Sequence, residues 1–322
     1  MEVRKVFAAT LEKMMRENEN IVMLDADLAK AGGTFGLREI FPDRAFDVGI
    51  AEANMACVAA GLAAYGFVPF IHSFAPFASR RIFDQIAVSI AYGGNNVKII
   101  GSDPGIAAEL NGGTHMSFED VAAMRAIPGM LIFEPVDARQ MEEAMPAIVE
   151  YDGPVYVRMF RKETPDVFTE PDYKFNLFKA DVLREGTDVS IFVTGLLTSD
   201  ALRAADMLRE EGVSAEVINI HTLKPVDRQA VLKSVKKTGR LVIVHETNEF
   251  CGFGAEIAFE VAFGCLRNSL RGISRQMRRR RRQRQIRRGG QAQRAETVLR
   301  AYRQRYSGQG KDLALKTTGV AL

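Results

Sequence analysis

DVGIAEANMACVAAGLAAYGFVPFIHSFAPF, residues 47–77, indicates the fold class because it places a helix-forming segment directly before a buried strand. Residues 50–66 are rich in alanine and apolar on most sides, which predicts a buried helix that ends at Gly66. FVPFIH at 67–72 then has the continuous apolar pattern of a buried strand. A helix followed at once by a buried strand is typical of a parallel sheet.

The same alternation extends in both directions from this stretch. Crossover helices between parallel strands require such a pattern, and their handedness is fixed. We therefore predict an α/β protein built from two successive open, mostly parallel sheets. The expected strands are IVMLDAD (21–27), FVPFIH (67–72), NVKIIGSD (96–103), GMLIFEP (129–135) and PVYVRM (154–159), then VSIFVTG (189–195), AEVINIH (215–221) and RLVIVHE (240–246).

Changes in composition divide the chain. Residues 1–160 form the first predicted domain, and the proline-containing, charged segment 161–180 is a predicted linker. A second, smaller α/β domain is predicted over 181–265. Beyond it, residues 266–322 lose the strand pattern and contain RRRRR at 278–282. Because an α/β domain does not lose its pattern in mid-fold, we expect this tail to be disordered and foreign to the domain.

Composition and the lack of sorting signals argue against a membrane-spanning, secreted or disulfide-rich protein. The chain is 47% apolar and 26% charged, as in globular domains, and no apolar run is long enough to cross a bilayer. MEVRKVFAATLEKMM, at the start, lacks the features of a signal peptide. Three cysteines without CxxC spacing favour neither a disulfide framework nor a zinc site. We expect a cytoplasmic protein with no membrane partner and no metal site of its own.

The net positive charge of the chain comes from its C-terminal part. Residues 266–322 carry 17 basic and two acidic residues, whereas residues 1–265 carry 26 basic and 38 acidic residues. An acidic body does not favour binding to a polyanion. A nucleic-acid-binding protein acting through the tail is therefore a remote alternative, and we expect no nucleic-acid partner.

Glu52 is the one carboxylate in the apolar segment 50–66. It is either a helix N-terminal carboxylate favoured by the dipole, or a buried acid that shares a proton with a bound heterocycle. Phe74 and Phe77 follow the next strand. Such a pair is either core packing or, at the carboxyl end of a parallel strand, a platform for a flat ring.

The polar, glycine-rich loop GSDPGIAAELNGGTHMSFED, residues 101–120, contains His115. A surface histidine is one interpretation, but loops at this position line the ligand site of open α/β sheets. Arg158 and Arg161 stand at the end of another strand, where guanidinium groups clamp phosphates, although surface arginines are the commoner case.

Taken together, these stretches resemble the C-terminal half of the transketolase family, over about residues 1–263. The motifs that carry the resemblance are RK (4–5), DADLA (25–29), DVGIAEANM (47–55), FIHSFAPF (70–77) and ELNGGTHMSFED (109–120). The resemblance implies that residues 1–160 are a pyrimidine-binding domain and that 181–265 are a truncated transketolase C-terminal domain. A chain of this extent is similar to one subunit of a split transketolase.

The resemblance also implies residue roles. Glu52 would contact N1′ of the thiamine diphosphate aminopyrimidine and, with His115, act in catalysis, and Phe74 and Phe77 would pack on the pyrimidine ring. Arg4 and Arg161 would hold the sugar phosphate together with His115. Two departures put the exact sugar in doubt: Asn111 stands where many relatives have an aspartate, and Ser102-Asp103-Pro104 replaces an early histidine.

The implied partner is an N-terminal transketolase subunit that supplies the Mg²⁺–diphosphate site, with sugar phosphates as substrates and a heterotetramer as the assembly. The implied reaction transfers a two-carbon ketol unit from a ketose phosphate to an aldose phosphate in the pentose phosphate pathway. Other thiamine diphosphate enzymes remain alternatives, namely the β-subunit of a 2-oxoacid dehydrogenase and 1-deoxyxylulose 5-phosphate synthase.

The arginine-rich tail has a separate explanation. Back-translation from Gln283 with a shift of one base permits a string that resembles the missing family ending, with an FGEVG turn and a stop codon at Leu315. We therefore hypothesise a frameshift between about residues 263 and 283. Resequencing this region tests the hypothesis, and an intact frame would refute it.

Overall fold

The first of two sheets organises most of the chain. The structure, a computed structural model, describes residues 1–264. Its seven-stranded sheet has the order β10-β5-β6-β4-β3-β1-β2, and every pairing except β10 with β5 is parallel. The strands are β1 (Ile21–Asp25), β2 (Ala45–Asp47), β3 (Val68–Phe74), β4 (Lys98–Ser102), β5 (Leu131–Phe133), β6 (Val155–Met159) and β10 (Thr222–Lys224).

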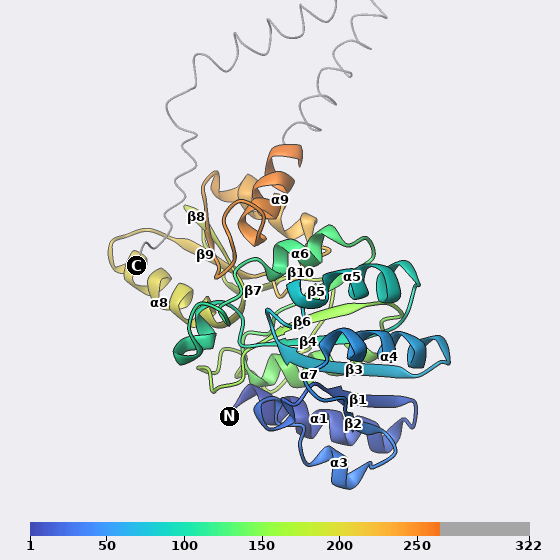
Figure 1. The fold of residues 1–322 in the computed structure, drawn as a ribbon. Helices are drawn as coiled ribbons and strands as arrows, with labels where there is room; N and C mark the ends of the chain where they lie inside the picture. The colour runs from blue at the N-terminus through green and yellow to red at the C-terminus, as the bar shows by residue number, and fades with distance from the viewer. Residues whose placement is uncertain (265–322) are drawn as a thin grey trace, which may run out of the picture. The chain divides into compact units, whose positions relative to one another are not determined.

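Helices cover both faces of this sheet, which is why its strands are apolar throughout rather than alternating. On one face α1 (Val3–Glu17) and α7 (Ala138–Glu150) pack on residues such as Phe70. On the other face α4 (Glu52–Ala64) and the π-helical turns η2 (Ile86–Tyr92) pack on residues such as Ile71. Figure 1 shows α4 and α1 on opposite sides of the sheet.

The second sheet has four strands in the order β11-β8-β9-β7. The pairs β11–β8 and β8–β9 are parallel, and β7 is an antiparallel edge strand. Its elements are β7 (Asp181–Arg184), β8 (Val189–Val193), α8 (Thr198–Glu210), β9 (Ala215–Asn219), α9 (Arg228–Thr238) and β11 (Leu241–Val244).

The two sheets share one core. The short strand β10, which the sequence pattern does not predict, follows β9 in the chain but pairs with β5 of the first sheet. Buried residues of both parts, among them Ile132 and Phe192, belong to a single apolar cluster. Residues 1–261 accordingly form one compact unit.

The remaining elements are short and lie mostly at the carboxyl ends of strands. They are α2 (Ala29–Gly32), α3 (Leu37–Ile40), η1 (Arg80–Ile82), α5 (Phe83–Gln85), η3 (Gly105–Asn111), α6 (Asp120–Ala126) and η4 (Gly195–Leu197), with residues 253–264 also helical. Within residues 1–264, no helix has the length and apolar character needed to cross a membrane.

The predicted α/β class with mostly parallel sheets is confirmed. The prediction that the segment 50–66 is a buried helix is wrong for one face of α4. Met55 and Ala59 are buried, but Val58 and Tyr65 are 39% and 89% exposed. The predicted tail, residues 266–322, lies outside the described residues.

Candidate active site

Glu52 is the first residue of α4, and its side chain is buried, with 4% relative exposure for the residue. Arg81, from η1, donates a hydrogen bond from Nη1 to Oε1 of Glu52 over 2.5 Å. Glu52 therefore occupies a helix N-terminus and is also buried, whereas its sharing of a proton with a bound heterocycle stays a prediction. The ion pair with a guanidinium is a feature that the sequence did not predict.

Arg81 also contacts an aromatic ring of the predicted site. The carbon at the centre of its guanidinium lies 3.7 Å from the ring centroid of Phe77, a cation–π contact. The preceding Arg80 instead pairs at the surface with Glu119 and with the Thr114 carbonyl. Nothing in the local sequence SRRI distinguishes the two arginines, so no local signal could have identified Arg81 as the site residue.

Phe74, Phe77 and His115 form an aromatic cluster. The His115 ring centroid lies 5.6 Å from Phe74 and 5.1 Å from Phe77, and the two phenylalanine rings are 6.2 Å apart. All three pairs are edge-to-face, a favourable arrangement for aromatic rings. The structure thus brings together residues of the β3 end and of the 101–120 loop, as their positions after parallel strands predict.

Arg161 also lies against this cluster, at Phe74. Its guanidinium carbon is 4.9 Å from the Phe74 ring centroid, and the guanidinium pairs with the buried carboxylate of Asp103. Asp103 also accepts the Arg161 backbone N–H over 3.0 Å and has a left-handed φ of +51°. Aspartate adopts a left-handed φ more readily than most residues other than glycine, and such conformations occur often at functional sites.

Arg4 and Asn111 lie close to this region in different ways. The Arg4 backbone N–H donates to the Arg161 carbonyl over 3.4 Å, while its side chain pairs with Glu2. Asn111 is exposed at the end of η3, in the loop that continues to His115. Of the predicted substrate residues, the structure therefore places Arg4 beside Arg161, and Asn111 on the same loop as His115.

Arg158 is not available to a phosphate, so that interpretation is wrong. It is fully buried and pairs with Asp120 and Glu134. Burial opposes its charge, but these two carboxylates raise the pKa of Arg158 above its ordinary value. Its strand end faces the second sheet, where Thr194 donates to Glu134 over 2.8 Å.

A buried hydrogen-bond network joins the neighbouring strands β1, β3 and β4. His72 Nδ1 lies 2.8 Å from Asp25 Oδ1, and its Nε2 lies 3.0 Å from Ser102 Oγ. Thr34 adds a hydrogen bond to the second oxygen of Asp25 over 2.7 Å. All of these side chains are buried, so the network holds the carboxyl ends of β1, β3 and β4 together.

Comparison with known proteins identifies the family. Residues 1–166 match "Transketolase, pyrimidine binding domain", and residues 178–277 match "Transketolase, C-terminal domain". The chain belongs to the transketolase family. It is 50% identical over 256 residues, 80% of this chain and 79% of the relative, to the 6-deoxy-6-sulfo-D-fructose transketolase subunit SqwH of Clostridium sp. strain MSTE9.

Two further relatives are also named as subunits or products of split transketolase genes. An apulose-4-phosphate transketolase subunit of Phocaeicola vulgatus is 40% identical over 78% of this chain and 81% of its own length. A solved structure described as a split gene transketolase, inactive beta4 tetramer, is 40% identical, with a TM-score of 0.75 over 81% of this chain and 85% of that one. The chain is thus a transferase subunit of transketolase type, and its pyrimidine-binding domain implies thiamine diphosphate as the cofactor.

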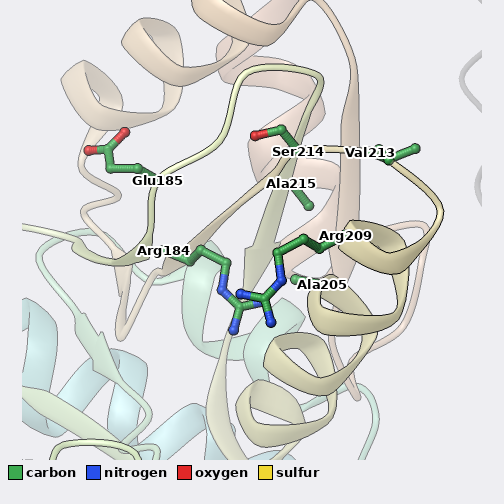
Figure 2. A pocket seen from close by; sticks show the side chains of 8 residues that line it. Arg184, Glu185, Ala205, Arg209, Val213, Ser214 and Ala215 are labelled. Carbon is green, nitrogen blue, oxygen red and sulfur yellow. The ribbon is translucent and has the colours of Figure 1, made fainter.

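A pocket elsewhere in this transketolase-family chain does not share residues with the site. It has a volume of about 280 Å³ and is lined by residues of β7, α8 and the turn before β9, including Arg184, Arg209 and Ser214. Figure 2 shows the guanidinium groups of Arg184 and Arg209 close together. Both arginines pair with Asp206, so their charge is partly neutralised.

Metal ligands are not gathered in the described part of this transketolase-family chain. Within residues 1–264, no group of three or more His, Cys, Asp or Glu side chains is arranged to hold a metal ion.

Proposed function

We propose that the chain is the C-terminal subunit of a thiamine diphosphate-dependent transketolase that transfers a two-carbon ketol unit from a ketose phosphate to an aldose phosphate. An N-terminal subunit supplies the Mg²⁺–diphosphate site and completes a heteromeric enzyme of the cytoplasm. The observation that carries the proposal is the buried Glu52 carboxylate, which shares Arg81 with an aromatic cluster assembled from predicted site residues.

The residues of the site fit an aminopyrimidine. A planar guanidinium already lies against both Glu52 and Phe77, so the two groups accept a flat, hydrogen-bonding group between them. The Ser73 hydroxyl, on the strand that ends in Phe74, is buried and has no hydrogen-bond partner among residues 1–264. Glu52 would hold N1′ of the ring, and the side chains of Phe74 and Phe77 would pack against it.

Each group of this chain then has a defined task. The bound cofactor supplies the carbanion chemistry, and the protein supplies orientation and proton bias. Glu52 holds a proton at the ring nitrogen, as a positioned general acid–base group. The aromatic cluster would exclude water from that contact, and Arg81, whose side chain is 45% exposed, would move toward solvent to admit the ring.

Substrate binding is assigned to the loop and strand ends beyond the cluster. His115 and Asn111 face the sugar, and Arg161 and Arg4 hold its anionic end. The names of the two relatives describe ketoses that carry a sulfo or a phosphate group. Both are anions that guanidinium groups bind, so we propose an anionic ketose as the donor.

The exposed face of α4 supports a partner subunit next to the site. Ile50, two residues before Glu52, is 76% exposed, and Val58 on α4 and Tyr65 at its C-terminal end are 39% and 89% exposed. Exposed large apolar side chains are found at interaction surfaces when a partner covers them. A subunit that covers this face would enclose the cofactor between the two chains.

Reconstitution tests the proposal. The chain is mixed with an N-terminal transketolase subunit, thiamine diphosphate and Mg²⁺, and ketol transfer to ribose 5-phosphate is measured. Parallel reactions use xylulose 5-phosphate and 6-deoxy-6-sulfofructose as donors, which separates a phosphate from a sulfonate preference. We expect transfer only when both subunits are present. A folded complex that transfers from neither donor contradicts the proposed function.

A further inference from the structure

The loop that carries Asn111 and His115 is closed at its base. The Gly105 backbone N–H donates to the Ser117 carbonyl over 2.9 Å, which joins the two ends of the 105–117 loop. Within it, the His115 N–H donates to the Gly112 carbonyl over 3.0 Å. The position of the loop therefore depends on what holds this base.

Residues that follow the second sheet in the chain hold the base directly. Glu246, just after β11, accepts the Ile106 backbone N–H at Oε1 over 3.0 Å. The Asn248 backbone N–H donates to the Phe118 carbonyl over 2.8 Å on the other side of the loop. These two hydrogen bonds flank the point where the loop leaves the first domain.

Gly105 shows how closely the loop is pressed onto Glu246. It has a left-handed φ of +56°, and a Cβ at this position would lie 3.0 Å from Glu246 Oε1 and 3.2 Å from Glu246 Cβ. A side chain at residue 105 would push the loop away from the carboxylate. The approach of backbone to carboxylate thus requires glycine.

The charges around Glu246 are unbalanced. Arg158 is the buried cation next to three acidic side chains, Glu246, Glu134 and Asp120. Burial raises the pKa of Glu246 to about 7, with Arg158 lowering it and Glu134 raising it further. Burial and Arg158 together lower the pKa of the adjacent His245, so it does not add a second cation near neutral pH.

We propose that Glu246 is a positioning residue for donor binding: its carboxylate anchors the first turn of the 105–117 loop and so sets where Asn111 and His115 meet the substrate. The role of these two residues rests on the proposed function, whereas the anchoring of the loop does not. Glu246 itself touches neither substrate nor cofactor. The second domain would then contribute to substrate affinity through a contact with the loop rather than through a ligand site of its own.

Three variants of the full chain separate positioning from stability. Glu246→Ala removes the acceptor, and Glu246→Gln keeps an acceptor oxygen without the ionisable group. Glu216→Ala is the matched control, because Glu216 is also a buried carboxylate of the second sheet but bonds Ser234 and Lys237 instead of the loop.

The first measurement is kinetic and uses the complex with the N-terminal subunit, thiamine diphosphate and Mg²⁺. Glu246→Ala should raise the donor KM by about tenfold, the order expected for losing a hydrogen bond to a charged group. It should leave kcat within about threefold and cofactor affinity within about twofold. Glu246→Gln keeps a neutral acceptor oxygen, as protonated Glu246 does, so its donor KM should lie between those of the wild type and Glu246→Ala. Glu216→Ala should leave donor KM unchanged.

The dependence of donor KM on pH adds a second test, because a purely structural role of Glu246 would not change it. In the wild type, donor KM should rise as pH falls through about 7, because a protonated Glu246 is a weaker acceptor. In Glu246→Gln this inflection should be absent. An unchanged KM in Glu246→Ala, or equal changes in Glu246→Ala and Glu216→Ala, would overturn the proposal.

The second measurement is hydrogen–deuterium exchange in the isolated chain, which does not depend on activity. Peptides covering residues 105–117 should exchange faster in Glu246→Ala and not in Glu216→Ala. Unchanged protection in Glu246→Ala overturns the anchoring. If exchange changes as expected but the wild-type complex transfers no ketol group, the anchoring stands and the proposed function fails.

Discussion

The two sheets use the carboxyl ends of their parallel strands in opposite ways. In the first sheet, β3 ends at Phe74, whose ring contacts His115. Asp103 directly follows β4 and pairs with Arg161. In the second sheet, the residues after β8 and β11 bond the first domain, Thr194 to Glu134 and Glu246 to Ile106. The same strand–helix pattern thus builds a candidate site where the edge is open to a ligand, and an internal joint where a neighbouring domain covers it.

The strongest effect should come from a change at the first edge. Glu52→Gln removes the acid–base group but keeps the size of the side chain. We expect turnover of the reconstituted enzyme to fall by about 10² to 10⁴, the contribution of a positioned general acid–base group. Steady-state kinetics measure the loss, with Glu12→Gln as control because Glu12 pairs with Arg16 on the surface of α1. Turnover within threefold of the wild type would remove Glu52 from the mechanism.

A substitution at the covered edge should instead lower the free energy of unfolding. Arg158→Met leaves Asp120, Glu134 and Glu246 buried without their cation, and breaking such a buried network costs about 3–5 kcal/mol. Urea unfolding of the isolated chain measures this loss. Arg203→Met, which breaks the exposed pair with Asp200, should cost less than about 0.5 kcal/mol. Similar costs for the two variants would show that the joint is not a stabilising network.

A smaller difference in stability is expected between substitutions of two adjacent arginines at the open edge, Arg81 and Arg80. Arg81→Met leaves the Glu52 carboxylate buried without its partner, so we expect a loss of about 1–3 kcal/mol in the free energy of unfolding. Arg80→Met breaks a surface pair and should change stability by less than about 0.5 kcal/mol. The measurement is urea unfolding of both variants side by side. Equal effects would mean that Glu52 does not depend on Arg81.

The weakest effect is a pH dependence at the joint. Burial raises the pKa of Asp181 to about 6, although Tyr173 and Gln140 donate hydrogen bonds that act in the opposite direction. The folded state therefore favours the protonated form, and that stabilisation is present below about pH 4 and lost as pH rises through about 6.

The variant Asp181→Asn has no ionisable group at this position, so it should not lose this stabilisation as pH rises. The stability of the wild type relative to the variant should fall by about 1–2 kcal/mol between about pH 4 and pH 7, an amount reduced by the partial exposure of the side chain. Thermal unfolding at several pH values measures the difference. Asp200→Asn, at an exposed site on α8, should show no such trend, and a flat difference for Asp181→Asn would contradict the assignment.

The sequence predicts the first edge better than the second. Apolar strands that alternate with helices predict parallel sheets, and residues directly after such strands must lie at one edge, which is why Phe74 and His115 meet as expected. Glu52 is evident as the one carboxylate in an apolar helix. These inferences depend on residues close together in sequence.

What the sequence does not predict depends on contacts across long separations. Arg158 and Arg161 are three residues apart, yet one is buried in the joint and the other lies against Phe74. The strand β10 returns to the first sheet, and Glu246 reaches a loop 140 residues earlier in the chain. Local patterns carry no signal for which strand end a second domain will cover.

If the open edge holds a thiamine cofactor as proposed, Glu52 governs proton removal from it. Hydrogen–deuterium exchange at C2 of thiamine diphosphate reports on that step alone, and NMR follows it in the complex of this chain with an N-terminal subunit. We predict rapid exchange with the wild-type chain and exchange slowed by about 10² or more with Glu52→Gln. Equal exchange rates in the two complexes, with cofactor bound in both, would contradict this role of Glu52.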